Sequence, residues 1–201
     1  MVYIFDRLDQ YTDEAYEAHL SSLPQWRREK ALQYKKLNDR KRSVLAFVLL
    51  ERALREEYGI TEVPEFVYNE FGKPSLSNLP IHFSLSHCRD AVACAVSDHN
   101  IGIDVETIVP YNPDIARRVC TEKELEILEN SENPDLDFIK LWTIKEAISK
   151  LEGFGLLLDF KRIRPEFYSI HTEMCRGSNC VFSICTVGKE DIRVIRKLDF
   201  N

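Results

Sequence analysis

Two long stretches of the chain place apolar residues every three to four positions, which is the spacing of an amphipathic helix. In residues 39–58 the pattern ends at Gly59, a typical helix terminator, and its apolar positions are Leu45, Val48, Leu49, Ala53 and Leu54. Residues 135–152 show the same spacing, and Gly153 follows directly. We therefore expect one major helix in each half of the chain.

Shorter helices are predicted from the residues that start them. Thr12 precedes two acidic residues, which indicates an N-cap, and Pro24 suits the first position of a helix over residues 24–37. Thr121 and Glu124 have the spacing of a capping box, which predicts a short helix over residues 121–129.

The remaining apolar segments are short and rich in alternating or β-branched residues, as in strands. We expect strands at residues 2–5 and 66–71, the latter leading into a Gly-Lys-Pro turn. Segments 82–87, 91–98 and 101–108 follow one another with short connections, which predicts three antiparallel neighbours. Three further strands are expected in the tail, at residues 167–174, 180–187 and 192–198.

The two halves thus share an order in which helices come before strands. This order predicts an α+β fold of two similar halves, residues 1–102 and 103–201, although no sequence repeat with a fixed period is present. Ligand sites tend to occur where such units meet, so we expect the strand near residue 102 to lie close to the functional site.

Composition narrows the class of protein. The chain has 201 residues, of which 44% are hydrophobic, enough for a packed core, and its net charge of −6 argues against a nucleic-acid partner. The first residues lack the pattern of a signal peptide and no apolar run is long enough for a membrane span, so we expect a cytoplasmic protein that does not enter the membrane. In that compartment the six cysteines should be reduced thiols.

The strand IGIDVE carries the first candidate site. Asp104 and Glu106 are two residues apart and project from the same face, next to Gly102, which leaves room for a close approach. Their carboxylates repel each other unless that face is solvated or holds a hard cation such as Mg²⁺. Oxygen ligands alone do not distinguish Mg²⁺ from Mn²⁺.

The segment LWTIKEAISK carries the second candidate site. Its buried stripe contains Leu141, Ile144 and Ile148, whereas Glu146 and Lys150 lie four residues apart on another face. The pair is either an ordinary surface Glu–Lys contact or a third acidic ligand with a cation beside it.

Two further groups suggest phosphate binding. Ser86 and His87 end a strand, where their side chains could contact a phosphate; zinc binding by His82, His87, Cys88 and His99 matches no known ligand spacing. The basic segment 27–42 is either a solvated helix face or a polyanion site, and no glycine-rich phosphate loop is present.

Taken in order, these segments resemble the 4′-phosphopantetheinyl transferases, specifically the longer, surfactin-type subfamily. That family is marked by Gly-x-Asp-x-Glu followed by Trp-Ser/Thr-x-Lys-Glu-Ala/Ser-x-x-Lys, and both motifs stand here, from Gly102 to Glu106 and from Trp142 to Lys150. The resemblance runs from about Pro24 to Gly155. It implies two α+β halves in a pseudo-twofold arrangement, a cleft between them, and a monomer.

The implied reaction moves phosphopantetheine from coenzyme A to a serine of an apo carrier protein and releases 3′,5′-ADP. The resemblance makes Asp104, Glu106 and Glu146 the ligands of Mg²⁺ and makes Glu146 and Lys150 catalytic. The residues that fall where the family contacts the nucleotide's phosphates are Arg27, Lys30, Arg42, Ser43, Lys73, Ser86 and His87. Ser84 and Cys88 depart from the commoner family residues, asparagine and a small residue, which bears on coenzyme placement.

Two alternatives stay open from the sequence. Three acids with basic residues would also suit another Mg²⁺-dependent enzyme that cleaves pyrophosphates. A non-catalytic module that binds carrier proteins would be expected to have lost one of the acidic ligands or Lys150, yet all four are present.

Overall fold

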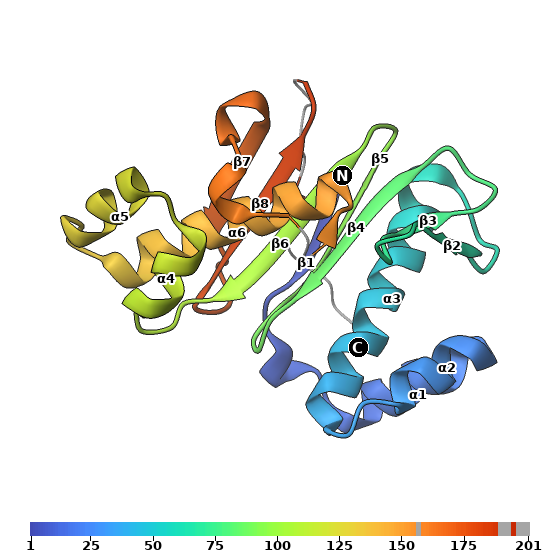
Figure 1. Ribbon diagram of the computed structural model, residues 1–201. Coiled ribbons are helices and arrows are strands. Elements are labelled where there is room, and N and C mark those ends of the chain that lie inside the picture. The colour runs from blue at the N-terminus through green and yellow to red at the C-terminus, as the bar shows by residue number, and fades with distance from the viewer. Residues whose placement is uncertain (156–157, 189–193, 196–201) are drawn as a thin grey trace.

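Two long helices and two main β-sheets make up most of the structure, as the computed structural model shows (Figure 1). It describes residues 1–155, 158–188 and 194–195. The α-helices are α1 (Asp13–Ser22), α2 (Gln25–Leu32), α3 (Leu37–Tyr58), α4 (Pro113–Val119), α5 (Glu122–Glu129) and α6 (Pro134–Glu152), with 3-10 turns η1 (Leu8–Gln10), η3 (Phe160–Arg162) and η4 (Pro165–Phe167). The described strands are β1 (Val2–Phe5), β2 (Phe66–Tyr68), β3 (Pro74–Leu76), β4 (His82–His87), β5 (Val92–Ser97), β6 (Ile101–Thr107), β7 (Ser169–Met174), β8 (Cys180–Thr186) and β9 (Val194–Ile195).

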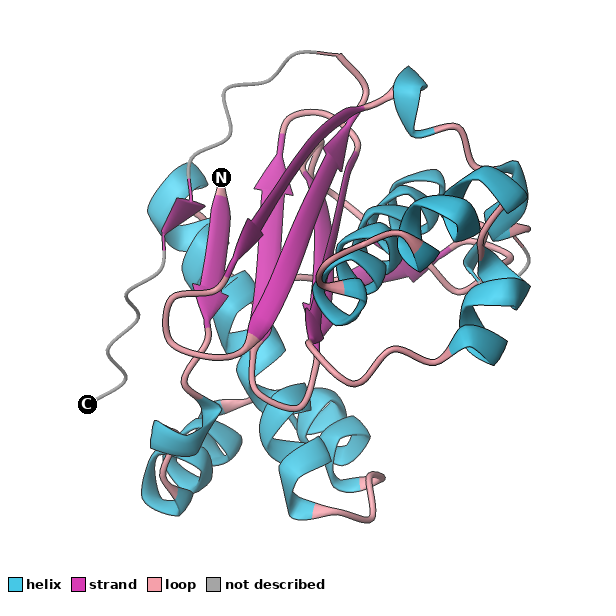
Figure 2. Cartoon of the chain, turned by 90° about the vertical axis from the view of Figure 1, so that its left-hand side faces the viewer, coloured by secondary structure: helices cyan, strands magenta, loops and turns pink. Residues whose placement is uncertain are grey.

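The expected α+β class is confirmed, and the strands are grouped as follows. One sheet has the order β4-β5-β1-β9, in which only β1 and β9 run parallel. A second sheet has the order β6-β8-β7 and is antiparallel throughout. Strands β2 and β3 form a separate hairpin. Figure 2 shows the strands in the middle of the molecule with helices on either side.

Alternating side chains of the strands build separate hydrophobic layers. One face of the first sheet packs with α3 and α1 in a cluster that includes Tyr3, Cys94 and Leu49. Its other face packs against the second sheet, where Ile4 shares a cluster with Ile103. The remaining face of the second sheet is covered by α6. The order is therefore helix α3, first sheet, second sheet, helix α6.

The prediction of three antiparallel neighbours is correct for β4 and β5 and wrong for β6. Strand β6 forms its ladder with β8, since β1 already takes the second edge of β5. Strands β4 and β6 nevertheless lie side by side (Figure 1), joined by serine side chains. Ser84 Oγ accepts a hydrogen bond from the Ile103 amide at 3.1 Å, and Ser86 Oγ accepts one from the Val105 amide at 3.3 Å. Two polar side chains thus satisfy buried backbone groups where the sheets meet.

Local signals set most helix ends as predicted. Thr12 caps α1 and Thr121 forms the expected capping box with Glu124. Gly59 and Gly153 end α3 and α6 in the left-handed conformation, with φ of 68° and 78°. Pro24, expected as the first helical residue, is instead the N-cap of α2, because its ψ of 150° is extended.

Other boundaries were less predictable. The strand expected at 66–71 ends at Tyr68. A turn follows, in which Asn69 Oδ1 accepts hydrogen bonds from the Phe71 and Lys73 amides. The strand expected at 192–198 is described only at residues 194–195; the rest of that segment lies outside the described residues. The expected division between residues 102 and 103 falls inside β6.

Candidate active site

Three elements meet at the carboxylate of Asp104. Asp104 lies on β6 and is 2% exposed. Its Oδ1 accepts hydrogen bonds from Ser86 Oγ of β4 at 2.7 Å and from Lys150 Nζ of α6 at 2.6 Å. Lys150 Nζ in turn donates to Ser86 Oγ at 2.7 Å. Asp104 and Lys150, which are 46 residues apart in the chain, are therefore joined by a partly buried ion pair that shares the Ser86 hydroxyl.

Gly102 makes this meeting of β6 and α6 geometrically allowed. A Cβ atom at this position would lie 2.0 Å from the Ala147 carbonyl oxygen and 2.8 Å from the Leu151 amide nitrogen. Only glycine permits the helix backbone to pass so close to the strand. The group that approaches at Gly102 is thus α6 itself, and the glycine places Glu146 and Lys150 beside Asp104.

Glu106 and Glu146 bring two further carboxylates to the same place. Both side chains are half-buried. Burial, followed by the charge of Asp104, raises the pKa of Glu106 to about 8, and the same two causes raise the pKa of Glu146 above its ordinary value. Lys150 opposes both shifts. The acids are therefore close enough to disfavour one another's ionised forms, and a bound cation would relieve that repulsion.

The fit of a metal to these acids can be tested on Asp104. Its second oxygen, Oδ2, is buried and has no hydrogen-bond partner among the described residues. A buried carboxylate oxygen without a partner is costly, and a hard cation is one group that would satisfy it. In the described part of the chain, no three His, Cys, Asp or Glu side chains are placed closely enough to hold a metal as they stand. The donor set therefore suits Mg²⁺ in chemistry, and side-chain rotation is needed to close it.

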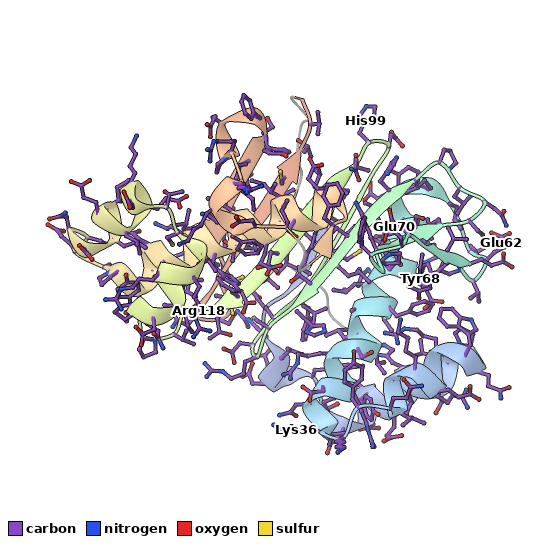
Figure 3. All side chains as sticks on the ribbon, viewed as in Figure 1. Lys36, Glu62, Tyr68, Glu70, His99 and Arg118 are labelled. Carbon is purple, nitrogen blue, oxygen red and sulfur yellow. The ribbon has the colours of Figure 1, made fainter. Side chains whose placement is uncertain are left out.

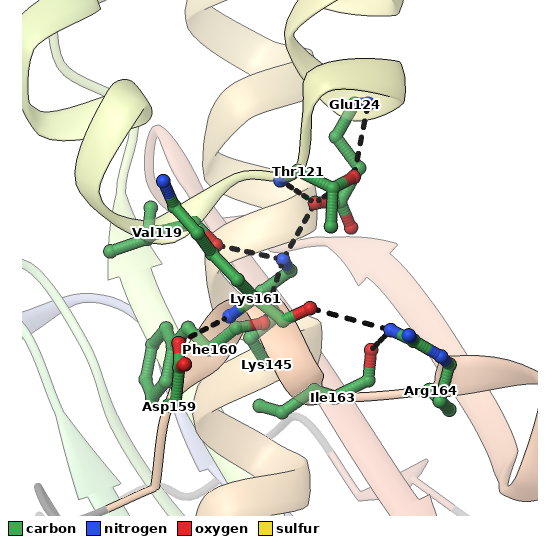
Figure 4. A network of polar contacts seen from close by, with 9 residues as sticks. All are labelled: Val119, Thr121, Glu124, Lys145, Asp159, Phe160, Lys161, Ile163 and Arg164. Atoms are coloured by element: carbon green, nitrogen blue, oxygen red, sulfur yellow. Dashed lines mark hydrogen bonds and ion pairs between the residues drawn. The ribbon is translucent and has the colours of Figure 1, made fainter.

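Lys145, the first lysine of the motif around Glu146, lies in a different environment. It is fully buried, and its Nζ donates to the Val119 carbonyl, the Glu124 carboxylate and the Phe160 carbonyl at 2.8–3.1 Å (Figure 4). It joins α6 to the α4–α5 connection and to η3. This lysine therefore fixes the orientation of the helix that carries Glu146 and Lys150. Lys145 follows Leu141 by four residues and precedes Ile148 by three, so the helical spacing places it on the same buried face as those two residues.

His87 and Arg42 extend the site away from Lys150. The surrounding protein and then the charges of Arg42 and Lys150 lower the pKa of His87. Arg42, near the start of α3, forms an ion pair with Asp39 one turn earlier. Ser86 and Lys150 are in contact, and His87 lies within the electrostatic influence of both Lys150 and Arg42.

Arg27, Ser43 and Lys30 form a second group at the α2–α3 side. Arg27 is buried, and its Nη2 donates to Ser43 Oγ at 2.9 Å while the guanidinium packs over the Phe47 ring. Arg27 Nη1 is buried and has no partner among the described residues. Lys30 Nζ contacts the Tyr68 hydroxyl at 3.3 Å, and Tyr68 lies on the hairpin near α3 (Figure 3).

Lys73 is placed apart from both groups, at the C-terminal end of α6. Its Nζ donates to Asn100 Oδ1 at 3.0 Å and to the Leu151 carbonyl at 2.7 Å, and burial lowers its pKa. Asn69 of the same hairpin donates to the Gly153 carbonyl at 3.0 Å. The hairpin is thus tied to the end of α6, and Lys73 takes part in that tie.

A cavity of about 260 Å³ opens between Lys73 and Lys150. Its walls are mainly apolar, and they include Phe71, Pro74, Phe83 and Leu85. The predicted site residues are therefore distributed along a path. Lys73 and the apolar cavity lie at one end, Lys150 and the acids in the middle, and His87 with Arg42 beyond them.

Sequence reasoning missed several partners of these residues. Asp39, Tyr68 and Asn100 each hold a predicted basic residue, yet nothing in their local pattern announces a partner that is distant along the chain. The zinc alternative gains no support, because His82, His87, Cys88 and His99 form no ligand group within the part of the chain that is described. All six cysteines are free and buried.

Comparison with known proteins finds related sequences. The sequence model of the 4′-phosphopantetheinyl transferase superfamily matches residues 100–185, which include β6 and α6. The chain is 32% identical over 151 residues to 4′-phosphopantetheinyl transferase Sfp of Bacillus subtilis (strain 168), covering 73% of this chain and 67% of that protein. It is 39% identical over 148 residues to 4′-phosphopantetheinyl transferase AcpT of Salmonella typhi, covering 69% and 72%.

Other relatives are matched over a smaller share of their own length. With 4′-phosphopantetheinyl transferase gsp of Aneurinibacillus migulanus the identity is 33% over 141 residues, covering 69% of this chain and 59% of the relative. The matched part thus spans about three fifths to two thirds of the Bacillus-type relatives. No helix in the described residues is both long and apolar enough to cross a membrane.

Proposed function

The chain belongs to the 4′-phosphopantetheinyl transferase superfamily, and from this we propose that it transfers 4′-phosphopantetheine from coenzyme A to a serine of an apo carrier protein. The observation that carries the proposal is the convergence of Ser86, Asp104 and Lys150 from three elements, with Glu106 and Glu146 beside them. In this group the Lys150 ammonium can bind a phosphate, and the carboxylates can bind a metal ion or accept a proton.

We assign Asp104, Glu106 and Glu146 as the residues that would hold Mg²⁺, and Mn²⁺ has the same ligand preference. The partnerless Oδ2 of Asp104 and the raised pKa values of both glutamates support this assignment. When bound, the metal would offset the negative charge of the diphosphate.

The chain's own residues would carry the proton and orient the leaving group. The carrier serine attacks the phosphorus that bears pantetheine, and Glu146 takes the proton of its hydroxyl. The bond from that phosphorus to the bridging oxygen breaks, and the electron pair leaves on the terminal phosphate of 3′,5′-ADP. Lys150 Nζ, held by Ser86 and Asp104, stabilises that phosphate or supplies a proton to it.

Coenzyme A binding is assigned to the path of polar groups. His87 and Arg42, together with Arg27, Lys30 and Ser43, would bind its phosphates. The apolar cavity between Lys73 and Lys150 suits the flat adenine base, because Phe71, Pro74 and Phe83 offer surfaces on which a ring can pack. Lys73 would then stand at the base end of the molecule.

Several finer properties are also proposed. The division into similar halves, residues 1–102 and 103–201, is supported by the recurring arrangement of one long helix covering one sheet. A monomer follows from the surfactin-type resemblance. Six free thiols favour the cytoplasm, where thiols remain reduced, and we propose no nucleic-acid or membrane partner.

Intact-mass spectrometry tests the proposal. The purified protein would be mixed with coenzyme A, Mg²⁺ and apo carrier proteins from fatty-acid, polyketide and nonribosomal peptide synthesis. One phosphopantetheine added to a carrier, and absent after EDTA treatment, is the expected result. Cleavage of coenzyme A without a modified carrier would favour the alternative of a pyrophosphate-cleaving enzyme. Carrier binding without either change would favour a non-catalytic module.

A further inference from the structure

Three of the six buried cysteines lie together, between the end of β4 and the β7–β8 turn. Cys88 directly follows β4 and Cys180 begins β8, and their sulfur atoms are 3.5 Å apart. Cys175 directly follows β7, and its backbone amide donates to the Cys180 carbonyl at 2.8 Å. All three belong to the hydrophobic cluster between the two sheets. The mechanism proposed above uses none of these thiols.

The contact between Cys88 and Cys180 joins the two sheets beside the proposed active site. Cys88 follows His87 in the chain. Cys180 is opposite Thr107 in the β6–β8 ladder, and Thr107 follows Glu106. The two sulfurs are in contact but farther apart than the roughly 2.0 Å of a disulfide. A bond between them would therefore pull together the segments that carry His87 and Glu106.

Both thiols ionise less readily than an ordinary cysteine. The hydrogen bond with Cys180, followed by burial, raises the pKa of Cys88 well above its ordinary value. A hydrogen bond with Cys175 raises the pKa of Cys180 to about 11, although the hydrogen bond with Cys88 opposes that rise. The thiolate, not the thiol, attacks an oxidant. We therefore expect the pair to stay reduced in brief contact with an oxidant and to react over minutes to hours.

The surroundings of the pair admit a small oxidant. Cys88 is 7% exposed, whereas Cys180 is fully buried. Arg89 and Asn179, the chain neighbours of the two cysteines, line a cavity of about 630 Å³ beside the start of α3. A molecule of the size of hydrogen peroxide can enter this cavity, whereas the burial of Cys180 excludes attack by a bulky disulfide.

We propose that hydrogen peroxide joins Cys88 and Cys180 in a reversible disulfide, and that this bond slows the transfer reaction. One thiolate attacks the peroxide, the O–O bond breaks, and a sulfenic acid and hydroxide are formed. The second sulfur attacks the sulfenic sulfur, the S–O bond breaks, and the leaving oxygen departs as water. Two thiols are thus oxidised by two electrons, and one peroxide is reduced to two waters. The slowing rests on the proposed function, whereas the disulfide does not.

Peptide mapping by mass spectrometry tests the bond itself. The protein is treated with hydrogen peroxide, the remaining thiols are alkylated, and trypsin is added. Trypsin cleaves after Arg176, which separates Cys175 from Cys180. The expected product is the peptide of Cys88 joined to that of Cys180, and dithiothreitol should separate them. Fragmentation distinguishes Cys180 from Cys185, which is on the same peptide. A bond between Cys175 and Cys180, or irreversible oxidation without a cross-link, would overturn the proposal.

Transfer rates test the consequence, and each variant is compared with its own untreated sample. After catalase has removed the peroxide, the unmodified chain should be slowed by about tenfold or more, because small displacements near reacting groups have effects of this size. Dithiothreitol should restore the rate. Cys88→Ala and Cys180→Ala each remove one partner, so their rates should not respond to peroxide. Cys94→Ala is the matched control on the opposite face of the first sheet, and it should respond as the unmodified chain does.

Equal slowing of the unmodified chain and of both partner variants would overturn the proposal, because other groups would then be the ones oxidised. A cross-link that leaves transfer unchanged would also overturn it. Thermal unfolding shows whether each variant is folded, and mapping of the unmodified chain needs no variant. If the unmodified chain forms the cross-link but modifies no carrier protein, the proposed transfer fails and the disulfide site is supported.

Discussion

Lys150 Nζ lies 2.6 Å from Asp104 Oδ1, and Ser86 Oγ contacts both groups. The lysine assigned to the leaving phosphate is therefore held by one of the carboxylates assigned to the metal. The i,i+4 neighbour of Lys150 on the helix, Glu146, remains available to a proton or a metal. This pairing of α6 with β6 gives Lys150 and Glu146 separate roles, whereas their spacing on the helix surface alone would suggest that they pair with each other.

Replacing Glu146 by Gln should abolish transfer and leave the fold intact. The amide has the same size but neither accepts the proton nor carries the charge, so we expect the rate to fall by at least about 100-fold. Intact mass of the carrier measures the rate, and thermal unfolding reports the fold. The control is Glu126→Gln, an exposed position on α5, which should transfer normally. Near-normal turnover by Glu146→Gln would refute the role assigned to this residue.

Lys73→Ala should mainly raise the KM for coenzyme A. It should also lower the melting temperature, because Lys73 Nζ ties the hairpin to Asn100 and to the Leu151 carbonyl. Asn100→Ala separates the two effects, since it removes one partner of the tie but keeps the cation. We expect Asn100→Ala to lower the melting temperature with little change in KM. A collapse of kcat in Lys73→Ala at constant KM would contradict the assignment to ligand binding.

Gly102→Ala should destabilise the fold strongly. The added Cβ would lie 2.0 Å from the Ala147 carbonyl oxygen, so α6 must move away from β6. Overpacking of this kind costs about 3 kcal/mol or more in free energy of unfolding. Gly59→Ala is the comparison: its added methyl meets nothing within 4 Å, and only the left-handed backbone opposes it, at about 1–2 kcal/mol. Urea unfolding measures both, and a smaller loss for Gly102→Ala than for Gly59→Ala would be inconsistent with the packing described.

Acid should destabilise the protein through Glu124. Burial alone would raise the pKa of this carboxyl, but hydrogen bonds from Lys145 and from the Thr121 amide outweigh it and hold the pKa below its ordinary value. A lowered folded-state pKa stabilises the fold above the unfolded value of about 4.3, and the stabilisation is lost as pH falls through the folded value.

The variant Glu124→Gln tests this source of acid sensitivity. Urea unfolding at several pH values between 7 and 3 should show a smaller loss of stability on acidification for the variant than for the unmodified chain. Glu122→Gln, on an exposed position of the same helix, should retain the full dependence. Identical pH profiles for Glu124→Gln and the unmodified chain would show that the pair with Lys145 does not contribute.

Much of the local structure was determined by the sequence alone. The spacing of apolar residues and the caps at Thr12, Thr121 and Gly153 placed helix ends to within a few residues, because capping and amphipathic periodicity act within a few positions along the chain. The α+β class and the membership in the family followed from the order of segments and from two motifs whose residue types are tied to their spacing.

Only the tertiary structure decided how these segments meet. In the folded chain β6 forms its ladder with β8 rather than β5. Lys145 is buried and pairs with Glu124 of α5, and Lys150 pairs with Asp104 rather than with Glu146. Each of these pairings joins residues that are distant along the chain. Their choice depends on which sheet edge is free, how closely two backbones can approach and which buried charge needs a partner, and these conditions exist only once the whole core has formed.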